Sequence, residues 1–315
     1  MSSSSVKKNS TGVFHEGERA VQLRAGVTSM SDRVANGIHP TLPEAARAFL
    51  QEQRFAVIGG SDAQGRVWAS PLWGAAGFLA SPDPATVTID ALPAPGDPLY
   101  DTLTTAGTAA VPAVGLLVLD PATRRRMRVN GHAYFAKPDG LRIRVEQAYA
   151  NCPKYIQKRR IEGPAETNLP GETHHTRVLL PEHRAQITRA DTFFLATAHP
   201  ERGADASHRG GAPGFVHISD DGSNLLWPDY AGNAMFNTLG NIAAHSSAGL
   251  LFVDWETGAL LQITGKAHIL WNGPDVDRFP GAERAVSLPI DEVISRERAF
   301  PLHYRFEEAS PFNPH

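Results

Sequence analysis

A short segment in the second half of the sequence combines residue types that suit a phosphate group. Ser207-His208-Arg209-Gly210-Gly211 places a hydroxyl, a guanidinium and two glycines side by side. Arginine offers a charged fork that matches phosphate oxygens, serine offers a donor, and glycine lets the backbone come close to a ligand. We therefore predict an anion site at Ser207, Arg209, Gly210 and Gly211, the alternative being a glycine-rich turn with an exposed arginine.

Three asparagines follow at intervals of four residues. The stretch 233–242 is predicted to be a helix, so Asn233, Asn237 and Asn241 would share one of its faces. Such an amide face, with Pro228-Asp229 shortly before it, suits a phosphate or the edge of a heteroaromatic ring. The alternative is that Asn233 caps the helix and the other two asparagines face solvent.

A third candidate segment, Asn151-Cys152-Pro153-Lys154-Tyr155-Ile156-Gln157, lies near the end of the first half. Its Cys-Pro step predicts the end of a strand before the start of a helix. Lys154 and the amides of Asn151 and Gln157 are candidates for contacting the edge of a ligand. A nucleophilic Cys152 would need a nearby base and a lowered pKa, neither of which the sequence indicates, so a structural thiol is the favoured interpretation.

The basic run from Arg124 to Arg128 is predicted to be mostly a solvated hairpin, with Arg128 the candidate for pointing inward at an anion. The 13 histidines are scattered along the chain, which favours surface residues over a metal site. The sequence therefore predicts no metal site, and it identifies no catalytic residue.

Composition and absent motifs narrow the class of protein. Hydrophobic residues make up 42% of the 315 residues, charged residues 20%, and the formal net charge is -3, so neither disorder nor binding to nucleic acid is indicated. The sequence has no GxGxxG, GxxxxGK[ST] or HExxH motif. Dinucleotide-binding, P-loop and zincin sites therefore lack support.

Cysteine content and hydropathy predict where the protein resides. Cys152 is the only cysteine, so the chain alone forms no disulfide, thiolate-rich zinc site or four-cysteine cluster. The N-terminal segment lacks the apolar core of a signal peptide, and the longest apolar stretch, around 109–119, is shorter than the ~20 residues that span a bilayer. We therefore expect a cytoplasmic protein without a membrane partner.

The chain contains two copies of one unit. Leu42-Pro43-Glu44 opens the first copy and Leu180-Pro181-Glu182 opens the second. Three further blocks follow in the same order, at a near-constant spacing of about 134–138 positions. Chance similarity does not readily keep several blocks in order at one spacing, so the sequence predicts an internal duplication.

The two copies differ where a ligand would bind. Leu72 of the first copy aligns with Arg209 of the second. Asp97 and Asp101 of the first copy align with the first two asparagines of the second, and these carboxylates would repel an anion. The asymmetry predicts that the second copy holds most of the ligand site.

Each copy is predicted to consist mostly of short strands, because apolar runs alternate with turn-forming residues and the chain has 28 glycines and 24 prolines. A helix is expected at 43–53, with Thr41 as its cap. The predicted fold is mainly β with a few helices: two six-stranded-type barrels packed about a pseudo-twofold axis. The expected domains are an arm (1–40), a first repeat (41–160), a linker (161–178) and a second repeat (179–315).

With Phe14-His15-Glu16-Gly17-Glu18 and the segments 151–157, 207–215 and 228–241 in hand, the chain resembles the pyridoxamine 5'-phosphate oxidase-like family. It is most similar to the tandem branch of predicted flavin-nucleotide-binding proteins, and the resemblance covers nearly the whole chain. It implies two FMN-binding split β-barrel units with the flavin in the groove between barrels. In that family the barrels usually dimerise, whereas here the repeat would supply both halves.

The resemblance also implies a cofactor and its contacts. FMN would place its phosphate near Ser207 and Arg209 and its ring near Asp229 and the three asparagines, while Lys154, Tyr155 and Gln157 would approach from the other half. The residues predicted to bind FMN are Ser207, Arg209, Gly210, Gly211, Pro228, Asp229, Asn233, Asn237, Asn241, Lys154, Tyr155 and Gln157.

The function expected from this resemblance is an FMN-dependent oxidoreductase acting on an unidentified small molecule. The segment 300–306 lacks the arginine-rich substrate signature of true pyridoxamine phosphate oxidases, which puts vitamin B6 oxidation in doubt. A reductase partner would be a separate protein, and exposed strand edges would allow a homodimer. The alternative is a non-catalytic flavin or haem binding protein on the same fold.

Overall fold

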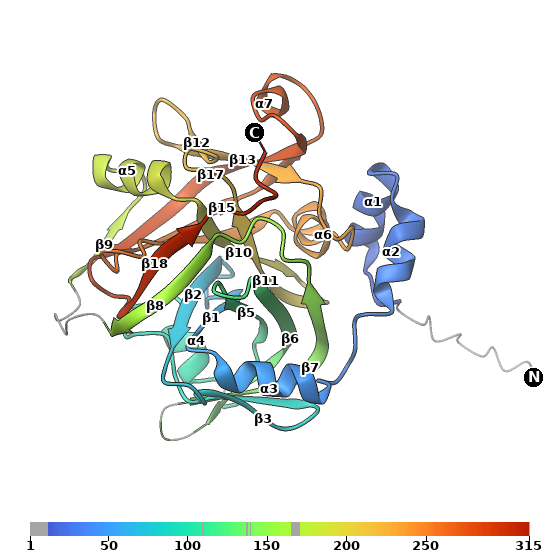
Figure 1. Ribbon diagram of the computed structural model, residues 1–315, viewed down its shortest axis with the longest axis vertical. Coiled ribbons are helices and arrows are strands. Elements are labelled where there is room, and N and C mark those ends of the chain that lie inside the picture. The colour runs from blue at the N-terminus through green and yellow to red at the C-terminus, as the bar shows by residue number, and fades with distance from the viewer. Residues whose placement is uncertain (1–11, 109, 137, 139, 165–170, 315) are drawn as a thin grey trace, which may run out of the picture.

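The structure is a computed structural model that describes residues 12–108, 110–136, 138, 140–164 and 171–314. Figure 1 shows two large sheets packed together, with helices at their margins. The helices are α1 (Glu16–Arg24), α2 (Thr28–Ala35), α3 (Glu44–Glu52), α4 (Tyr100–Thr104), α5 (Pro181–Arg189), α6 (Asn237–Ala244) and α7 (Pro274–Asp277). None of the helices in these ranges is both long and apolar enough to cross a membrane.

The strands form three sheets, and all of their pairings are antiparallel. The first sheet contains β1 (Phe55–Ser61), β2 (Val67–Trp73), β3 (Leu79–Asp83), β4 (Thr86–Ile89), β5 (Ala113–Asp120), β6 (Arg125–Ala136) and β7 (Gly140–Asn151). The second contains β9 (Thr173–Thr176), β10 (Thr192–His199), β11 (Gly203–Gly210), β12 (His217–Ile218), β13 (Asn224–Tyr230), β14 (Ser247–Val253), β15 (Leu260–Lys266), β16 (His268–Leu270) and β17 (Ala282–Arg296). A small sheet pairs β8 (Lys158–Pro164) with β18 (Leu302–Glu308).

The two large sheets repeat one topology. Their strand orders are β2-β1-β5-β6-β7-β4-β3 and β11-β10-β14-β15-β17-β13-β12, which correspond position by position. A helix lies at the same place in each copy: α4 follows β4 in the first, and α6 follows β13 in the second. The predicted mainly β fold of two tandem split barrels is confirmed.

Paired close contacts relate the halves by a pseudo-twofold axis. A Cβ on Gly115 of β5 would lie 2.6 Å from the backbone of Asp205 in β11. Its counterpart, Gly249 of β14, faces β2 in the same way, and a Cβ there would lie 2.5 Å from the Cα of Trp68. Only a residue without a side chain allows strands to approach this closely, so the glycines that open the matched apolar runs are required by the packing of one half on the other.

We expect Gly115→Ala to destabilise the fold by about 3 kcal/mol, because the added methyl group would press on backbone that cannot move independently. Urea unfolding would measure the loss. Gly37→Ala is the matched control, since its Cβ would meet the nearest atom at 3.4 Å, an ordinary contact. Equal unfolding midpoints for the two variants would contradict the close crossing.

Each half has its own apolar core, and a third core joins them. Ile58 and Trp68 belong to the core of the first half, and Phe193 and Trp227 to that of the second. The joining core includes Phe55 with residues of β10, β14 and β18, so the two barrels bury a continuous apolar interface.

Two helix predictions differ from the structure in detail. The helix expected at 43–53 is α3, but Thr41 does not cap it; its N-cap is Pro43, without a side-chain cap. The helix expected from Asn233 begins only at Asn237, so the prediction of three asparagines on one helix was wrong. Ala234 and Phe236 have positive φ angles of 61° and 60°, which end any helical run through them.

Contacts from the N-terminal arm hold the loop before α6, which contains Ala234 and Phe236. Ser31 of α2 donates its hydroxyl to the carbonyl of Ala234 at 2.8 Å, and Gln22 of α1 donates its amide to the carbonyl of Met235 at 2.9 Å. Helix α1 also packs directly on α6, and Figure 1 shows the two side by side at the edge of the second sheet. The arm therefore shapes the loop before α6.

The segment between the halves also contains strands. Strand β8 pairs with β18 near the C-terminus, and β9 pairs with β17. The strand end predicted before Cys152 is present, since β7 ends at Asn151, but no helix follows it. Tyr155 has a positive φ of 66° and the chain turns directly into β8.

Candidate functional site

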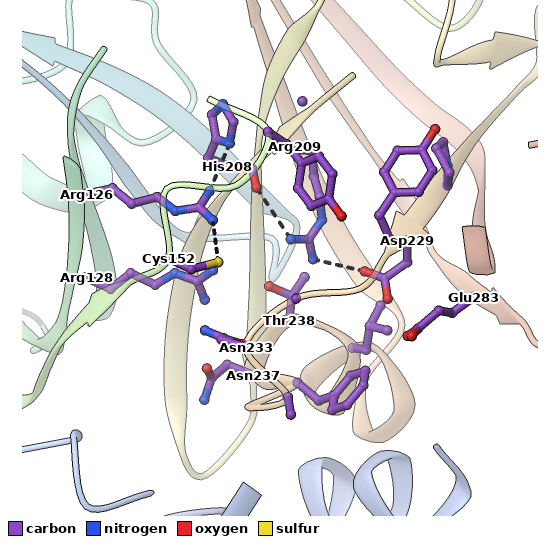
Figure 2. A pocket seen from close by; sticks show the side chains of 18 of the residues that line it. Arg126, Arg128, Cys152, His208, Arg209, Asp229, Asn233, Asn237, Thr238 and Glu283 are labelled. Atoms are coloured by element: carbon purple, nitrogen blue, oxygen red, sulfur yellow. Dashed lines mark hydrogen bonds and ion pairs between the residues drawn. The ribbon is translucent and has the colours of Figure 1, made fainter. Parts of the chain in front are cut away.

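A cavity lies at the junction of the two halves (Figure 2). Strand β6 and the turn after β7 line it from the first half, and β11, β13 and α6 line it from the second. It encloses about 90 Å³, which is below the roughly 300–1,000 Å³ of pockets that hold whole drug-sized ligands. Its size suits a phosphate-bearing end of a ligand rather than a complete nucleotide.

Three arginines converge on this cavity, as Figure 2 shows. Arg128 pairs with the buried Asp205 at 2.9 and 3.1 Å, and Arg209 lies 3.9 Å from a carboxylate oxygen of Asp229. Arg126 has no carboxylate partner in the described part of the chain. Its guanidinium instead contacts Nδ1 of His208 at 2.9 Å and the sulfur of Cys152 at 3.9 Å.

The surroundings of these arginines disfavour their own charges. Burial, together with the neighbouring Arg128, lowers the pKa of Arg126 to about 10. Burial also lowers the pKa of Arg209, which Asp229 partly offsets. The pKa of His208 lies well below its ordinary value because of burial and the adjacent arginines, so the ring is neutral. Its Nδ1 accepts a hydrogen bond from the Arg126 guanidinium.

Unmet hydrogen-bonding capacity accompanies this positive charge. Within the described ranges, the Nε atoms of Arg126, Arg128 and Arg209 are buried and have no partner. A buried N–H group without an acceptor is costly, as is the buried charge of Arg126 without a carboxylate partner, and an anion in the cavity would relieve both costs. The donor set therefore fits a phosphate.

Amides and hydroxyls complete the floor of the cavity. Asn233 accepts the backbone N–H of Met235 with its Oδ1, at 3.1 Å, which holds its side chain at the cavity edge. Asn237 donates its amide to Glu18 at 2.5 Å, so its carbonyl oxygen is the group left for a ligand. Both amides are labelled below the arginines in Figure 2.

The backbone is strained around the same space. Five described residues other than glycine have positive φ angles, and Tyr155, Ala234 and Phe236 among them line this cavity. Such conformations cost of order 1–3 kcal/mol each and persist where the surrounding structure enforces them, often at ligand sites.

The structure brings together seven of the twelve residues predicted to bind the cofactor. The seven that line the cavity are Tyr155, Arg209, Gly210, Pro228, Asp229, Asn233 and Asn237. Five do not line it, and these are Lys154, Gln157, Ser207, Gly211 and Asn241.

Hydrogen bonds within the chain explain why Ser207 and Asn241 do not line the cavity. Ser207 is fully buried and its hydroxyl bonds to the carbonyl of Leu195 and to Thr238. Both ends of the Asn241 amide are used, by His15 at 2.9 Å and by Thr197 at 3.0 Å. These two side chains support the site from behind.

The remaining three residues outside the cavity hold neighbouring segments. The amide of Gln157 donates to the carbonyl of Gly211 at 3.2 Å and its oxygen accepts the backbone N–H of Ser310 at 2.7 Å. Lys154 is partly buried and donates to the carbonyl of Ala231 at 3.3 Å. Tyr155 donates to the same carbonyl at 3.1 Å, which closes one side of the cavity.

Sequence analysis missed several residues of the cavity, including Arg126, Cys152, His208, Thr238 and Glu283. Arg128, which the sequence identified as the candidate for pointing inward, is buried and lines the cavity. Arg126 and Arg128 are two positions apart on β6 and therefore project from the same face of the sheet. This spacing was the signal that could have identified Arg126 as well.

At the corresponding place in the repeat, a buried Asp97 stands among residues that align with those of the cavity. Asp97 aligns with Asn233, Ser70 with Ser207, and Gln262 with Arg128. The carboxylate of Asp97 accepts the hydroxyl of Ser70 at 2.6 Å and the amide of Gln262 at 3.0 Å. Burial raises the pKa of Asp97, although these donors oppose the shift. The anion position at this place is thus taken by a side chain of the protein.

A cluster of His15, Glu16 and His199 has ligand atoms within 4.8 Å of one another, but its hydrogen bonds do not suit a metal. Backbone N–H groups donate to Nδ1 of both rings at 3.1 Å, so the proton of each ring is on Nε2. Those Nε2 atoms donate to Asn241 and Glu16. A metal-bound imidazole donates through its other nitrogen, which is impossible here.

Helix α1 carries a buried acid–base pair beside the site. Glu18 accepts the backbone N–H of His15 at 2.7 Å as well as the amide of Asn237. Burial raises the pKa of Glu18 to about 7 despite these donors. Burial and the nearby His199 lower the pKa of His15 to about 4.

The two shifts have opposite effects on stability. The raised pKa of Glu18 adds stability that is complete below its ordinary value of 4.5 and is lost as pH rises through about 7. The lowered pKa of His15 adds stability that is complete above its ordinary value of 6.5 and is lost as pH falls through about 4. Between pH 4.5 and 6.5 the two contributions therefore change in opposite directions.

We expect Glu18→Gln to make unfolding strongly pH-dependent. With only His15 remaining, the free energy of unfolding of the variant should fall by about 1–2 kcal/mol more than that of the parent on acidification from pH 6.5 to 4.5. This value is smaller than the full pKa shift of His15 would give, because water near the ring screens its charge. Urea unfolding across this range measures the difference. Parallel curves for parent and variant would contradict the opposed pair.

Comparison with known proteins gives one match to a family profile. Residues 179–303 match the sequence profile of the family described as Pyridoxamine 5'-phosphate oxidase. The chain matches no curated protein in sequence.

Solved structures with similar folds each cover little more than one third of the chain. HupZ from Group A Streptococcus is 15% identical and covers 36% of this chain and 91% of its own, with a TM-score of 0.31. A putative pyridoxamine 5'-phosphate oxidase from Lactobacillus delbrueckii is 19% identical and covers 38% and 94%, with a TM-score of 0.31. The FAD binding protein from Mycobacterium smegmatis is 12% identical and covers 38% and 97%, with a TM-score of 0.27.

The profile match falls on the half that supplies β11, β13 and α6 to the cavity, and the first half repeats its strand order. The resemblance to the pyridoxamine 5'-phosphate oxidase-like family that was expected from the sequence is therefore confirmed, and the sequence match falls on the second half of the chain.

Proposed function

We propose that the cavity between the halves binds FMN and that the protein is an FMN-dependent oxidoreductase. The observation that carries the proposal is Arg126, a guanidinium at the cavity without a carboxylate partner in the described residues. Arg128 and Arg209 add two more cations from opposite halves. A phosphate dianion is the ligand that such a set favours, and the family match supports a flavin as its carrier.

The fit of a whole flavin nucleotide requires one local movement. The enclosed space of about 90 Å³ accounts for the phosphate end only. Tyr155 and Lys154 close the cavity by donating to one carbonyl, that of Ala231. Opening these two contacts would extend the cavity between Tyr155 and Tyr230, whose ring centroids are 5.3 Å apart. Both contacts are partly exposed, so the cost of breaking them is small.

The residues present would bind and orient the cofactor rather than react with substrate. The three arginines would hold the phosphate, and the amide nitrogen of Asn233 and the amide oxygen of Asn237 are suited to the edge of a heteroaromatic ring. His208 is neutral and keeps the Arg126 guanidinium in place. Bound flavin would supply the hydride or electron transfer. The substrate would be a small molecule. The electrons that reduce the flavin would come from this substrate or from a separate reductase.

One flavin per chain is expected. Arg126 and Arg128 have Leu260 and Gln262 as their counterparts in the other half, and Asp97 already occupies the anion position there. A second phosphate would have to displace a hydrogen-bonded carboxylate of the same charge, which is unfavourable.

The test is the visible absorption spectrum of the purified protein, followed by heat release and chromatographic identification of the chromophore. A yellow protein that releases FMN in a one-to-one ratio with the chain supports the proposal. A colourless protein that takes up no added FMN would reject it. FMN that binds but is neither reduced by a nicotinamide donor nor reoxidised by an acceptor would favour the alternative, a non-catalytic flavin carrier.

A further inference from the structure

A second and larger cavity adjoins the first. It encloses about 570 Å³, within the roughly 300–1,000 Å³ typical of small-molecule sites. It lies where β7 continues past the end of β4, between α3, the hairpin that opens β6 and the arm. Figure 1 shows α3 beside β6 and β7 in this region.

Arg126 connects the two cavities, because its side chain lines both. Asn151 pairs with Arg126 across β6 and β7, so the two side chains project from the same face at adjacent positions. Neither atom of the Asn151 amide has a partner in the described residues, although both are buried. A molecule in the second cavity would thus be separated from the first by one arginine and one unsatisfied amide.

The lining of the second cavity defines the chemistry of its occupant. Much of the wall is apolar and includes Phe49, Met127 and Ala46. Three arginines, Arg124 to Arg126, line it, and no aspartate or glutamate of the described chain does. An apolar wall with unopposed positive charge suits a molecule with an aromatic or aliphatic body and an anionic group.

The three arginines are not equivalent. Arg124 is engaged by the carbonyls of Ile156 and Ala309 and by Glu308, so its charge is largely met. Arg125 has no hydrogen bond or ion pair in the described part of the chain, and its guanidinium lies 4.7 Å from the centre of the Phe49 ring. It is the exposed cation best placed to receive an anionic group at this cavity.

We propose that this second cavity is a ligand site, separate from the flavin site, and that it takes a largely apolar, aromatic anion. Arg125 would bind the anionic group, the α3 wall would cover the apolar body, and Asn151 with Arg126 would face the first cavity.

The test uses 8-anilino-1-naphthalenesulfonate, a fluorescent aromatic anion, and its uncharged analogue N-phenyl-1-naphthylamine. Both are titrated into the full chain with and without saturating FMN, and FMN binding is measured separately. We expect the anion to bind in the presence of FMN, about tenfold more tightly than the neutral analogue. Arg125→Gln should abolish that preference, whereas Arg142→Gln, a change of another exposed arginine on β7, should preserve it.

A cavity-filling variant locates the probe. Ala150 is an exposed β7 residue that lines the second cavity, so Ala150→Trp should weaken both probes at least about tenfold without changing FMN affinity. Ala85→Trp, at an exposed turn, is the matched control.

Unchanged probe binding in Ala150→Trp, equal binding of the two probes, or displacement of the anion by FMN would overturn the inference. If FMN does not bind but the anion remains sensitive to Ala150→Trp and Arg125→Gln, the proposed function fails and the inference of a separate anion site stands.

Discussion

Arg126→Met should weaken FMN binding about 10- to 150-fold, the effect of losing one charge-assisted contact worth about 1.5–3 kcal/mol. Arg126 is the guanidinium at the cavity that lacks a carboxylate partner among the described residues, so its charge is available to a ligand. The fold should be little affected, because the substitution removes a cation that burial already disfavours.

Riboflavin makes this experiment specific, because it has the same ring as FMN but no phosphate. Its affinity should be similar in the parent protein and in Arg126→Met, and Arg142→Met should leave the affinity for both ligands unchanged. Fluorescence titration gives all of these constants. An equal loss of affinity for riboflavin and FMN would show that Arg126 acts on the ring or on the shape of the cavity instead of on the phosphate.

Arg128→Met is expected to have the largest effect on stability, a loss of about 3–5 kcal/mol in the absence of ligand. Arg128 and Asp205 form an ion pair that is buried between the two halves, in which one guanidinium nitrogen, Nη1, contacts both carboxylate oxygens. Removing the arginine leaves the Asp205 carboxylate with two donors among the described residues, the hydroxyls of Tyr149 and Thr238. A buried carboxylate without a counter-charge is strongly unfavourable.

Two further variants separate this ion pair from general damage to the core. Adding Asp205→Asn to Arg128→Met should recover much of the loss, because asparagine is uncharged, its amide oxygen still accepts one of the hydroxyls of Tyr149 and Thr238, and its amide nitrogen can donate to the other. Arg305→Met breaks an exposed pair with Glu162 and should cost at most about 1 kcal/mol. Urea unfolding measures each value. A loss below about 1 kcal/mol for Arg128→Met would contradict the role given to the pair.

Much of the fold could be predicted because it is encoded twice. The matched blocks, including the apolar runs that begin at Gly115 and Gly249, predict two equivalent sheets, and the strand orders agree. The same glycines allow the close contact between halves. Pairing between β8 and β18 could not be predicted, because it joins segments nearly half the chain apart and neither has a partner nearby in sequence.

The site was only partly predictable for a related reason. Arg209 could be identified because the glycines that accompany it are adjacent in sequence. Arg126 was missed because its contact His208 belongs to the other half and a run of arginines alone looks like a solvated hairpin; its spacing of two residues from Arg128 was the one signal in the sequence. The helix start at Asn237 was missed because contacts from Gln22 and Ser31 of the arm impose the positive φ angles before it.

The central claim is that arginines from both halves hold the phosphate of one flavin nucleotide. The most direct test is a titration of the ligand-free parent protein with FMN and with riboflavin, read by flavin fluorescence. We predict one FMN per chain, with an affinity at least about a hundredfold above that of riboflavin. Equal affinity for the two flavins, or no binding of FMN, would contradict the claim.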